Sequence, residues 1–357
     1  MGAGDRRADV LKTILIIGAS GIIGRAHIRN LAGRDGTRII AASRTPEANL
    51  PDNAAAYPVD LTAGGFDPAP LKDVTHVLYS AYVNAHGFEA DRIPNLALMN
   101  GALDLCEACP NLEHITLMQG NKAYGSHLGP FKTPAKETDP RIPGGHFYDD
   151  QLDALTTRAD KNGWAWSALR PHVVIGPALK SPMNLMAVLG AYGTLQKAKG
   201  GPFAFPGPEA AFTPIYQATD SDLLSRAIDW CGEAEAARGE IFNITNGDYF
   251  RWTNVWDSLA AFFEIPPAPP ANIRLAETMA EDATLWMQIA KLHSLVENDL
   301  SAMVSWGFGD YVFGTTWDVM SDAVKIRKFG FQDYVETDAN LINRLTELRK
   351  LKIIPKL

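Results

Sequence analysis

The stretch T-I-L-I-I-G-A-S-G-I-I-G, residues 13–24, limits the possible folds more than any other feature of this sequence. Its aliphatic first half is typical of a strand buried on both faces of a parallel sheet. Glycines follow at every third position, and residues 22–32 have the apolar spacing of a helix. A strand, a glycine turn and a helix N-terminus together can hold a pyrophosphate. The sequence therefore predicts a dinucleotide site, formed by Gly18, Ser20, Gly21, Ile22, Ile23 and Gly24.

The first half of the chain alternates between short apolar runs and segments with helical spacing. Candidate strands lie at 14–17, 37–42, 56–59, 75–79, 114–118 and 165–169, and helices are predicted at 93–109 and 150–161. Strands that alternate with helices favour an α/β fold with a doubly wound parallel sheet.

After residue 170 this pattern changes, because prolines interrupt it. We expect helices at 183–197, 220–230, 253–263, 276–293 and 338–351, and one strand at 240–244. We interpret residues 1–12 as a disordered lead-in, and residues 13–175, joined by 215–245, as a nucleotide-binding domain. Residues 176–214 and 246–357 would form a smaller, mainly helical substrate lobe.

Composition argues against several classes of protein. The formal net charge of −8 is unfavourable for a nucleic-acid partner, which normally requires a basic face. No apolar run reaches the length of a membrane span, and the first dozen residues lack the apolar core of a signal peptide. Three cysteines fit a reducing compartment, and Cys106 and Cys109 are interpreted as helix residues rather than metal ligands. We therefore expect a cytoplasmic protein without a metal.

The ends of the predicted strands indicate which dinucleotide binds. Arg44 follows the second strand, where a cation favours a 2′-phosphate and therefore NADPH, and a carboxylate would favour NADH. A solvated surface arginine is the alternative. Asp60 ends the third strand, where it would accept a hydrogen bond from adenine or cap a turn. The expected cofactor contacts at strand ends are Ser43, Arg44, Thr45, Asp60, Leu61, Ser80, Ala81, Gln119 and Val173.

Two short segments have residues that can do chemistry, the loop M-Q-G-N-K-A-Y-G at 118–125 and the helix start H-F-Y-D-D at 146–150. Short-chain dehydrogenases use a serine, a tyrosine and a lysine four residues after the tyrosine. Here Leu152 occupies that lysine position relative to Tyr148, and Gly120 stands where the serine is expected. A lysine, Lys122, lies instead in the loop that faces the predicted helix.

With these motifs the chain resembles the progesterone 5β-reductase and iridoid synthase-like family of atypical extended short-chain dehydrogenases. The resemblance runs from about Ile14 to Pro355, and it also rests on W-S-A-L-R-P at 166–171, S-P-M-N-L at 181–185, F-N-I-T-N-G-D-Y-F-R-W at 242–252 and K-F-G-F at 328–331. It implies a Rossmann fold, an active site of Tyr148 and Lys122, and NADPH-dependent reduction of the carbon–carbon double bond of activated enones. His172 replaces the family's glycine, either as a second proton donor or as a packed side chain.

Elementary chemistry agrees with these implied roles. Hydride addition to the β-carbon of an enone places charge on the carbonyl oxygen, and the Tyr148 hydroxyl would stabilise that charge as a hydrogen-bond donor. Lys122 would act on Tyr148 electrostatically, hold the ribose hydroxyls, or both. Solvent can protonate the enolate carbon, so that no paired acid and base is required.

Substrate contacts are expected from Tyr82, Phe131, Asn184 and Phe212, which are candidates for the wall of an apolar pocket. Each has an alternative interpretation, a core position for the aromatic residues and a helix N-terminal role for Asn184. We expect a small apolar enone as the partner, with no nucleic acid or membrane and with a homodimer left open. The rival functions are a carbonyl reductase or sugar-nucleotide epimerase on the same fold, and an NADP(H)-sensing protein without turnover.

Overall fold

The computed structural model describes residues 11–45, 49–85 and 87–356, so most of the predicted lead-in, residues 1–10, lies outside the described residues. The chain divides into two compact units. The N-terminal unit comprises Met1–Ala123, Pro140–Arg170 and Ser225–Phe242, and the C-terminal unit comprises Tyr124–Asp139, Pro171–Leu224 and Asn243–Leu357. Whether they act as a cofactor domain and a substrate lobe stays a prediction.

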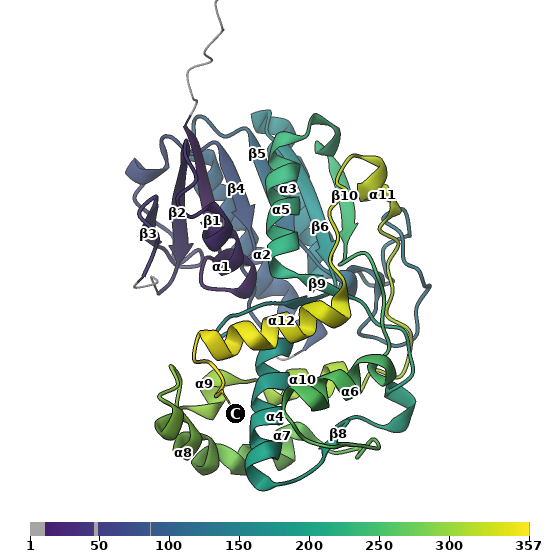
Figure 1. Ribbon diagram of the computed structural model, residues 1–357. Helices are drawn as coiled ribbons and strands as arrows, with labels where there is room; N and C mark the ends of the chain where they lie inside the picture. Colours follow the sequence, from purple (N-terminus) through teal and green to yellow (C-terminus); the bar gives the residue numbers. More distant parts are fainter. Residues whose placement is uncertain (1–10, 46–48, 86, 357) are drawn as a thin grey trace, which may run out of the picture. The chain divides into compact units, whose positions relative to one another are not determined.

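The N-terminal unit is built on a seven-stranded sheet with the order β10-β6-β5-β4-β1-β2-β3 (Figure 1). Its strands are β1 (Lys12–Ile17), β2 (Thr37–Ser43), β3 (Ala54–Pro58), β4 (His76–Tyr79), β5 (His114–Met118), β6 (Ala165–Pro171) and β10 (Glu240–Ile244). The central strand β1 pairs in parallel with both β2 and β4. The chain order reverses there, which is where open α/β sheets bind ligands at their carboxyl ends.

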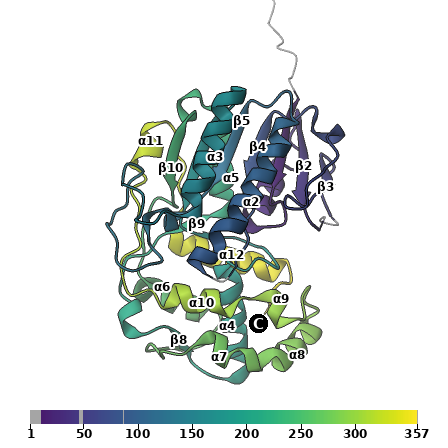
Figure 2. The same ribbon diagram turned by 180° about the vertical axis from the view of Figure 1, so that it is seen from behind.

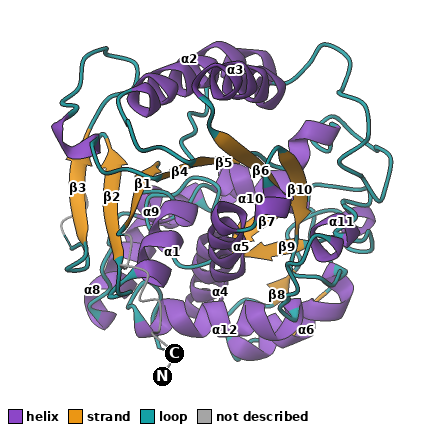
Figure 3. Ribbon diagram, turned by 90° about the horizontal axis from the view of Figure 1, so that it is seen from above, coloured by secondary structure: helices purple, strands orange, loops and turns teal. Residues whose placement is uncertain are grey.

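Helices cover both faces of this sheet. Figure 3 shows α2 (Phe88–Glu107) and α3 (Phe147–Asn162) on one face, with α1 (Ile22–Leu31) and α5 (Ser221–Glu233) on the other. The sheet is buried because its strands are rich in aliphatic residues, and Leu15, Ile17 and Leu117 are at most 1% exposed. The prediction of a doubly wound parallel sheet is confirmed.

The C-terminal unit is mainly helical (Figure 2). Its helices are α4 (Leu185–Lys199), α6 (Trp252–Phe262), α7 (Leu275–Thr278), α8 (Ala283–His293), α9 (Leu300–Met303), α10 (Trp306–Phe313), α11 (Val324–Lys328) and α12 (Thr337–Lys350). Short strands β7 (Val173–Ile175) and β9 (Ala218–Asp220) pair in parallel, as do β8 (Phe203–Ala204) and β11 (Pro267–Ala268). The core is aromatic, and Trp252, Trp256 and Phe313 lie with ring centroids 5.1–6.0 Å apart.

Single-turn 3₁₀ helices complete the chain at η1 (Ala69–Leu71), η2 (Asn121–Tyr124), η3 (Glu209–Ala211), η4 (Glu235–Ala237) and η5 (Ala280–Asp282). The turn η2 carries Lys122. Among the helices of the described residues, none is long and apolar enough to pass through a bilayer.

Several predicted elements differ from those observed. The helix expected at 276–293 is divided into α7, η5 and α8, and α9, α10, α11 and the short strands β7, β8, β9 and β11 were not predicted. Apart from the eight-residue α10, the elements that were not predicted have two to five residues, which is too few for a periodicity to be recognised. Helix α2 begins at Phe88 rather than near Ile93, since Pro94 lies inside the helix instead of marking its start.

Candidate active site

In the glycine turn after β1, the fold itself requires glycine at two of the three positions. Gly18 has φ +89°, and a Cβ there would lie 2.8 Å from the backbone nitrogen of Ala81. A Cβ on Gly24 would lie 2.4 Å from the Gly18 carbonyl oxygen. Gly21 differs, because its nearest neighbour would be the same oxygen at 3.4 Å, an ordinary contact. The protein itself therefore does not require glycine at 21, and the open space above it fits the close approach of a pyrophosphate.

The N-terminus of α1 also suits an anion. Gly21 is the N-cap, no side chain caps the helix, and the first turn has no acidic residue. Ser20 is exposed, Ile23 half-buried and Ile22 buried, so the turn presents mainly backbone. The free N–H groups and the helix dipole at such an end attract phosphate oxygens.

The end of β2 presents a cation to solvent. Arg44 and Thr45 are exposed, and the Ser43 hydroxyl donates to the Thr45 carbonyl over 2.8 Å. Asp60 lies near enough to be affected, since hydrogen bonds from Thr62 lower the pKa of Asp60 and the charge of Arg44 adds to the effect. The Asp60 carboxylate accepts from the Thr62 N–H and hydroxyl, which is the turn role proposed for it. A contact with adenine stays a prediction.

The residues that follow β4 have small side chains, and the loop after β3 packs closely against α2. Ser80 and Ala81 are half-buried, and the Ser80 hydroxyl donates to the Ile17 carbonyl over 3.0 Å. The carbonyl oxygen of Leu61 would lie 2.0 Å from a Cβ on Gly101, so α2 can approach this loop only with glycine at that position. Because Ser80 and Ala81 have small side chains, it is mainly their backbone that lies beside the glycine turn.

A capping box fixes Tyr148 in the first turn of α3. The backbone N–H of Tyr148 donates to His146 Nδ1 over 3.1 Å, and the His146 N–H donates to Asp149 Oδ2 over 3.1 Å. The ring of Tyr148 packs with its centroid 4.3 Å from that of Phe147. One turn later Leu152 is 7% exposed and belongs to the core. The helix therefore positions the tyrosine without offering a lysine beside it.

Gln119, at the end of β5, ties this helix start to the sheet. Its side-chain Nε2 donates to the Tyr148 carbonyl over 2.7 Å, and its Oε1 accepts from Arg170 Nε over 2.9 Å. Its backbone N–H donates to the Leu169 carbonyl over 2.8 Å. Both ends of the Gln119 amide thus form hydrogen bonds within the protein. The expected cofactor contacts of Gln119 and of Val173, the first residue of β7, stay predictions.

Lys122 and Tyr82 are connected through a residue that sequence reasoning missed, Asp91. Burial lowers the pKa of Lys122, and the charge of Asp91 opposes this shift. The Tyr82 hydroxyl donates to Asp91 Oδ2 over 2.8 Å. Burial, followed by the Asp91 bond and charge and by Tyr148, raises the pKa of Tyr82. These interactions connect Tyr82, Asp91, Lys122 and Tyr148 into one cluster.

Asp91 was not recognised from the sequence, because it belongs to no motif and a single acidic residue in the first turn of a helix is common at protein surfaces. Its signal would have been a tyrosine at 82 just after a strand end, followed by a carboxylate at the start of the next helix. Only the fold shows that Asp91 is 7% exposed.

Comparison with known proteins identifies the family of this chain. A family model described as a PRISE-like Rossmann-fold domain matches residues 67–355. This chain belongs to the PRISE-like family. It is an oxidoreductase of the short-chain dehydrogenase type.

Two curated relatives span nearly the whole chain. It is 28% identical to an (S)-8-oxocitronellyl enol synthase from Antirrhinum majus, covering 96% of this chain and 92% of the relative. It is 29% identical to a 3-oxo-Δ(4,5)-steroid 5β-reductase from Arabidopsis thaliana, with the same coverage. The resemblance inferred from the motifs is confirmed.

Solved structures support the fold alone. A UDP-glucuronic acid 4-epimerase from Bacillus cereus, in complex with NAD, has a TM-score of 0.65 at 16% identity and covers 95% of this chain and 99% of its own. A putative epimerase from Burkholderia cenocepacia has a TM-score of 0.66 at 17% identity, covering 95% and 98%. The Rossmann fold of the PRISE-like family is therefore shared with enzymes of other activities.

The substrate residues expected in the C-terminal unit have structural roles there. Asn184 is the N-cap of α4, since its Oδ1 accepts from the Met186 and Ala187 N–H groups over 3.0 and 3.3 Å. Its Nδ2 donates to the Ala178 carbonyl over 2.8 Å. Phe131 and Phe212 pack partly buried against the aromatic core. Contact of Tyr82, Phe131, Asn184 and Phe212 with substrate stays a prediction.

His172, which replaces the family's glycine, is packed. It is 4% exposed, its Nε2 lies 2.7 Å from the Ser321 hydroxyl, and its N–H donates to the Thr219 hydroxyl over 3.0 Å. Burial lowers the pKa of His172 to about 3. The imidazole is therefore neutral at physiological pH and does not serve as a ready acid.

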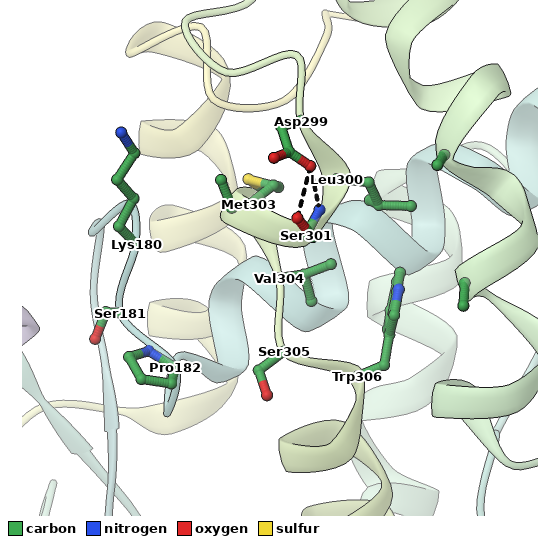
Figure 4. A pocket seen from close by; sticks show the side chains of 13 residues that line it. Lys180, Ser181, Pro182, Asp299, Leu300, Ser301, Met303, Val304, Ser305 and Trp306 are labelled. Carbon is green, nitrogen blue, oxygen red and sulfur yellow. Dashed lines mark hydrogen bonds between the residues drawn. The ribbon is translucent and has the colours of Figure 1, made fainter. Parts of the chain in front are cut away.

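A pocket of about 700 Å³ lies within the C-terminal unit (Figure 4). Two segments provide most of its lining, residues 180–182 and residues 299–306, and Trp306 supplies an aromatic wall. The Asp299 carboxylate accepts from the Ser301 N–H and hydroxyl over 2.9 and 2.7 Å, which fixes one rim. The volume is in the range of small-molecule sites, although none of the predicted site residues lines it.

Neither a metal centre nor a reactive thiol emerges in the described part of the chain. Within residues 11–45, 49–85 and 87–356, no three His, Cys, Asp or Glu side chains are grouped to hold a metal ion. Cys106 and Cys109 are free and buried. Burial raises the pKa of Cys109 to about 12, so this thiol stays protonated.

Proposed function

We propose that this protein reduces the carbon–carbon double bond of activated enones, with NADPH as the hydride source. The observation that carries the proposal is the cluster in the N-terminal unit, where a capping box fixes Tyr148 and the charge of Asp91 acts on Lys122. We assign to Lys122 the part of the lysine that is missing at Leu152. The names of the two curated relatives, an oxocitronellyl enol synthase and a steroid 5β-reductase, support it.

The cofactor would be held by groups already described. The uncapped N-terminus of α1 and the space above Gly21 would take the pyrophosphate, and the exposed guanidinium of Arg44 would take the 2′-phosphate. When bound, NADPH supplies the hydride that the reaction needs. The choice of NADPH over NADH depends on Arg44, because a bidentate guanidinium–phosphate contact is strong and specific.

Tyr148 would donate a hydrogen bond to the substrate's carbonyl oxygen. Hydride addition to the β-carbon turns that oxygen into an enolate oxygen, so this bond is stronger in the transition state than in the ground state. The loss of one such donor typically costs about 2.7–4 kcal/mol. Lys122 would strengthen the donor, because a nearby positive charge makes a phenol more acidic.

Tyr82 has a different part in this scheme. Its hydroxyl proton is engaged by Asp91, so Tyr82 is not free to donate to the substrate. Tyr148 is therefore the tyrosine of the cluster that we assign to the enolate oxygen. Protonation of the enolate carbon by solvent completes the reaction without a second acid.

The substrate would be a small apolar enone. The pocket beside Trp306 has the volume of a small-molecule site and a wall that includes Leu300, Met303 and Val304. We propose that this pocket, within the C-terminal unit, binds a small apolar molecule. Contact of the substrate with the four residues named from the sequence is a separate expectation.

Steady-state oxidation of NADPH against a panel of enones tests the proposal, with 2-cyclohexen-1-one, a steroid enone and a monoterpene enal as members. We expect a saturated ketone or aldehyde as the product. An allylic alcohol would instead assign the chain to the carbonyl reductases, and interconversion of UDP-sugars would assign it to the epimerases. Tight NADPH binding without consumption on any substrate would identify a sensing protein.

A further inference from the structure

The carboxylate of Asp91 is buried and holds the loop that follows β4. It is 7% exposed in the first turn of α2, and its Oδ1 accepts the Ala85 N–H over 2.6 Å while its Oδ2 accepts the Tyr82 hydroxyl over 2.8 Å. A buried charge is unfavourable unless it is paired as well as hydrogen-bonded. The cation on which Asp91 acts is Lys122.

The neighbouring cation does not compete for Asp91. Arg92, the next residue of α2, donates from Nε and Nη2 to the two carboxylate oxygens of Asp150 over 2.6 and 2.8 Å. The arginine that follows Asp91 in the chain is therefore paired with Asp150 and not with Asp91.

The bond from Tyr82 to Asp91 also fixes an aromatic ring. Tyr82 stacks on Phe147, with ring centroids 5.8 Å apart and an interplanar angle of 28°. Phe147 in turn packs against Tyr148, with centroids 4.3 Å apart. Three aromatic rings are thus held in sequence, and Asp91 anchors the outer one.

We propose that Asp91 is a positioning residue for the enone reaction, holding the Tyr82 ring beside Phe147 and Tyr148 while presenting a fixed negative charge to Lys122. The proposal rests on the proposed function for the reaction in which these residues act. It assigns different tasks to the two tyrosines, since Tyr82 shapes the site and Tyr148 donates to substrate.

The charge has a consequence for pH dependence. The charge of Asp91 from α2 acts on the pKa of Lys122, and Asp91 and Tyr148 from α3 act on the pKa of Tyr82. Burial lowers the pKa of Lys122 and Asp91 raises it. Removal of the Asp91 charge would therefore let the ammonium lose its proton at a lower pH.

The decisive variant is Asp91→Asn, which keeps an oxygen acceptor for one of the two donors and removes the charge. We expect the alkaline limb of the kcat/KM profile with an enone to move to lower pH, so that activity on that limb falls roughly two- to tenfold relative to the wild type. Asp104→Asn is the control, because it removes a carboxylate of the same helix that is paired with Arg158, so Arg92 stays bound to Asp150. The control should leave the alkaline limb in place.

A second measurement does not depend on turnover. Lysines methylated with ¹³C-formaldehyde are titrated by NMR, and the Lys122 signal is assigned by its loss in Lys122→Arg. In Asp91→Asn the signal should titrate at lower pH than in the wild type. An unchanged titration together with an unchanged kinetic profile would overturn the proposal.

The Tyr82→Phe variant separates the ring from the charge. It removes the hydroxyl and leaves the Asp91 carboxylate, so Lys122 should not titrate at lower pH, whereas KM for the enone should rise more than kcat falls. If the wild type reduces no enone, the proposed function fails, and the NMR titration still decides whether Asp91 acts on Lys122. A loss of folded protein in Asp91→Asn with the lysine titration unmoved would make Asp91 purely structural and would also overturn the proposal.

Discussion

Two buried aspartates, one in each unit, stand at the start of a helix and do opposite things. Asp220, 2% exposed, caps α5 through the Asp222 and Leu223 N–H groups and receives two hydrogen bonds from Arg344 over 2.7 and 2.9 Å. Asp91, 7% exposed, is held by a tyrosine hydroxyl and one backbone N–H. The first charge is neutralised by a partner that does no chemistry, and the second acts on Lys122.

The comparison shows that burial of a charge does not by itself indicate function. In the C-terminal unit the bidentate arginine makes the aspartate part of the framework. In the N-terminal unit the charge of Asp91 acts on Lys122, the lysine to which we assign a part in the proposed reaction. The identity of the partner therefore distinguishes a structural aspartate from a positioning one.

The largest expected effect is on the structural side of this comparison. Arg344→Met leaves Asp220 buried without its bidentate partner, and loss of one member of a buried ion pair typically costs about 3–5 kcal/mol. Urea unfolding should show that loss in the free energy of unfolding. The activity per folded molecule should not change, and a large fall in kcat of the folded variant would contradict the division drawn above.

Tyr148→Phe is the corresponding change on the functional side. We expect kcat to fall by about 10²–10³, because one hydrogen bond to the developing enolate is lost. The free energy of unfolding should stay nearly constant, since the capping box uses the backbone of Tyr148 and not its hydroxyl. Tyr249→Phe, at a tyrosine that is 66% exposed, is the matched control in the same kinetic assay.

A buried histidine makes the N-terminal unit sensitive to acid. Burial lowers the pKa of His27 to about 4 from an ordinary value of 6.5. Between pH 6.5 and pH 4 the unfolded chain therefore binds a proton at His27 that the folded chain does not bind. The contribution of neutral His27 to the free energy of unfolding is fully present above pH 6.5 and decreases as the pH falls toward 4. Between pH 7 and pH 5 the loss should be about 2 kcal/mol for this residue.

The comparison of unfolding free energies at pH 7 and pH 5 measures that loss. His27→Gln, whose amide can still bond to the Ser225 hydroxyl that lies 2.8 Å from His27 Nδ1, should show a smaller difference. An equal difference in both proteins would mean that other groups cause the acid sensitivity.

The smallest of these effects concerns the choice of cofactor. Arg44→Ser removes the exposed cation at the end of β2 and should weaken NADPH binding roughly tenfold, about 1.4 kcal/mol. NADH, which lacks the 2′-phosphate, should bind with unchanged affinity. Fluorescence titration with both dinucleotides measures the ratio, and equal weakening of both would place Arg44 outside the 2′-phosphate site.

The elements of the sheet could be predicted because each has a local signal. Strands β5 and β10 were predicted with the bounds that the structure shows. All five residues of β5 are buried, as expected of a strand covered on both faces, whereas β10 lies at the edge of the sheet and only its last three residues are buried. The predicted start of α2 was wrong, because proline is typical of the first turn of a helix and Pro94 lies further inside this one. The segment 276–293 was predicted as one helix because its apolar spacing continues across η5.

The candidate site could be predicted only in part. Tyr148 and Lys122 follow motifs, so a resemblance identifies them. Asp91 follows none, since its burial and its bond to Tyr82 arise from how α2 packs onto the sheet. Asn184 shows the converse limit, because one pattern served both for a substrate contact and for a cap, and the structure shows the cap.

Gly21 offers a way to separate folding from ligand binding by genetics. Because a methyl group there would meet only the Gly18 oxygen at 3.4 Å, and the backbone at φ −78° suits any residue, alanine is compatible with the fold. The same methyl group would occupy the space proposed for the pyrophosphate. A library selected for folded protein should therefore accept alanine at 21 and reject it at 18 and 24. The accepted chains would be folded proteins that cannot bind a dinucleotide.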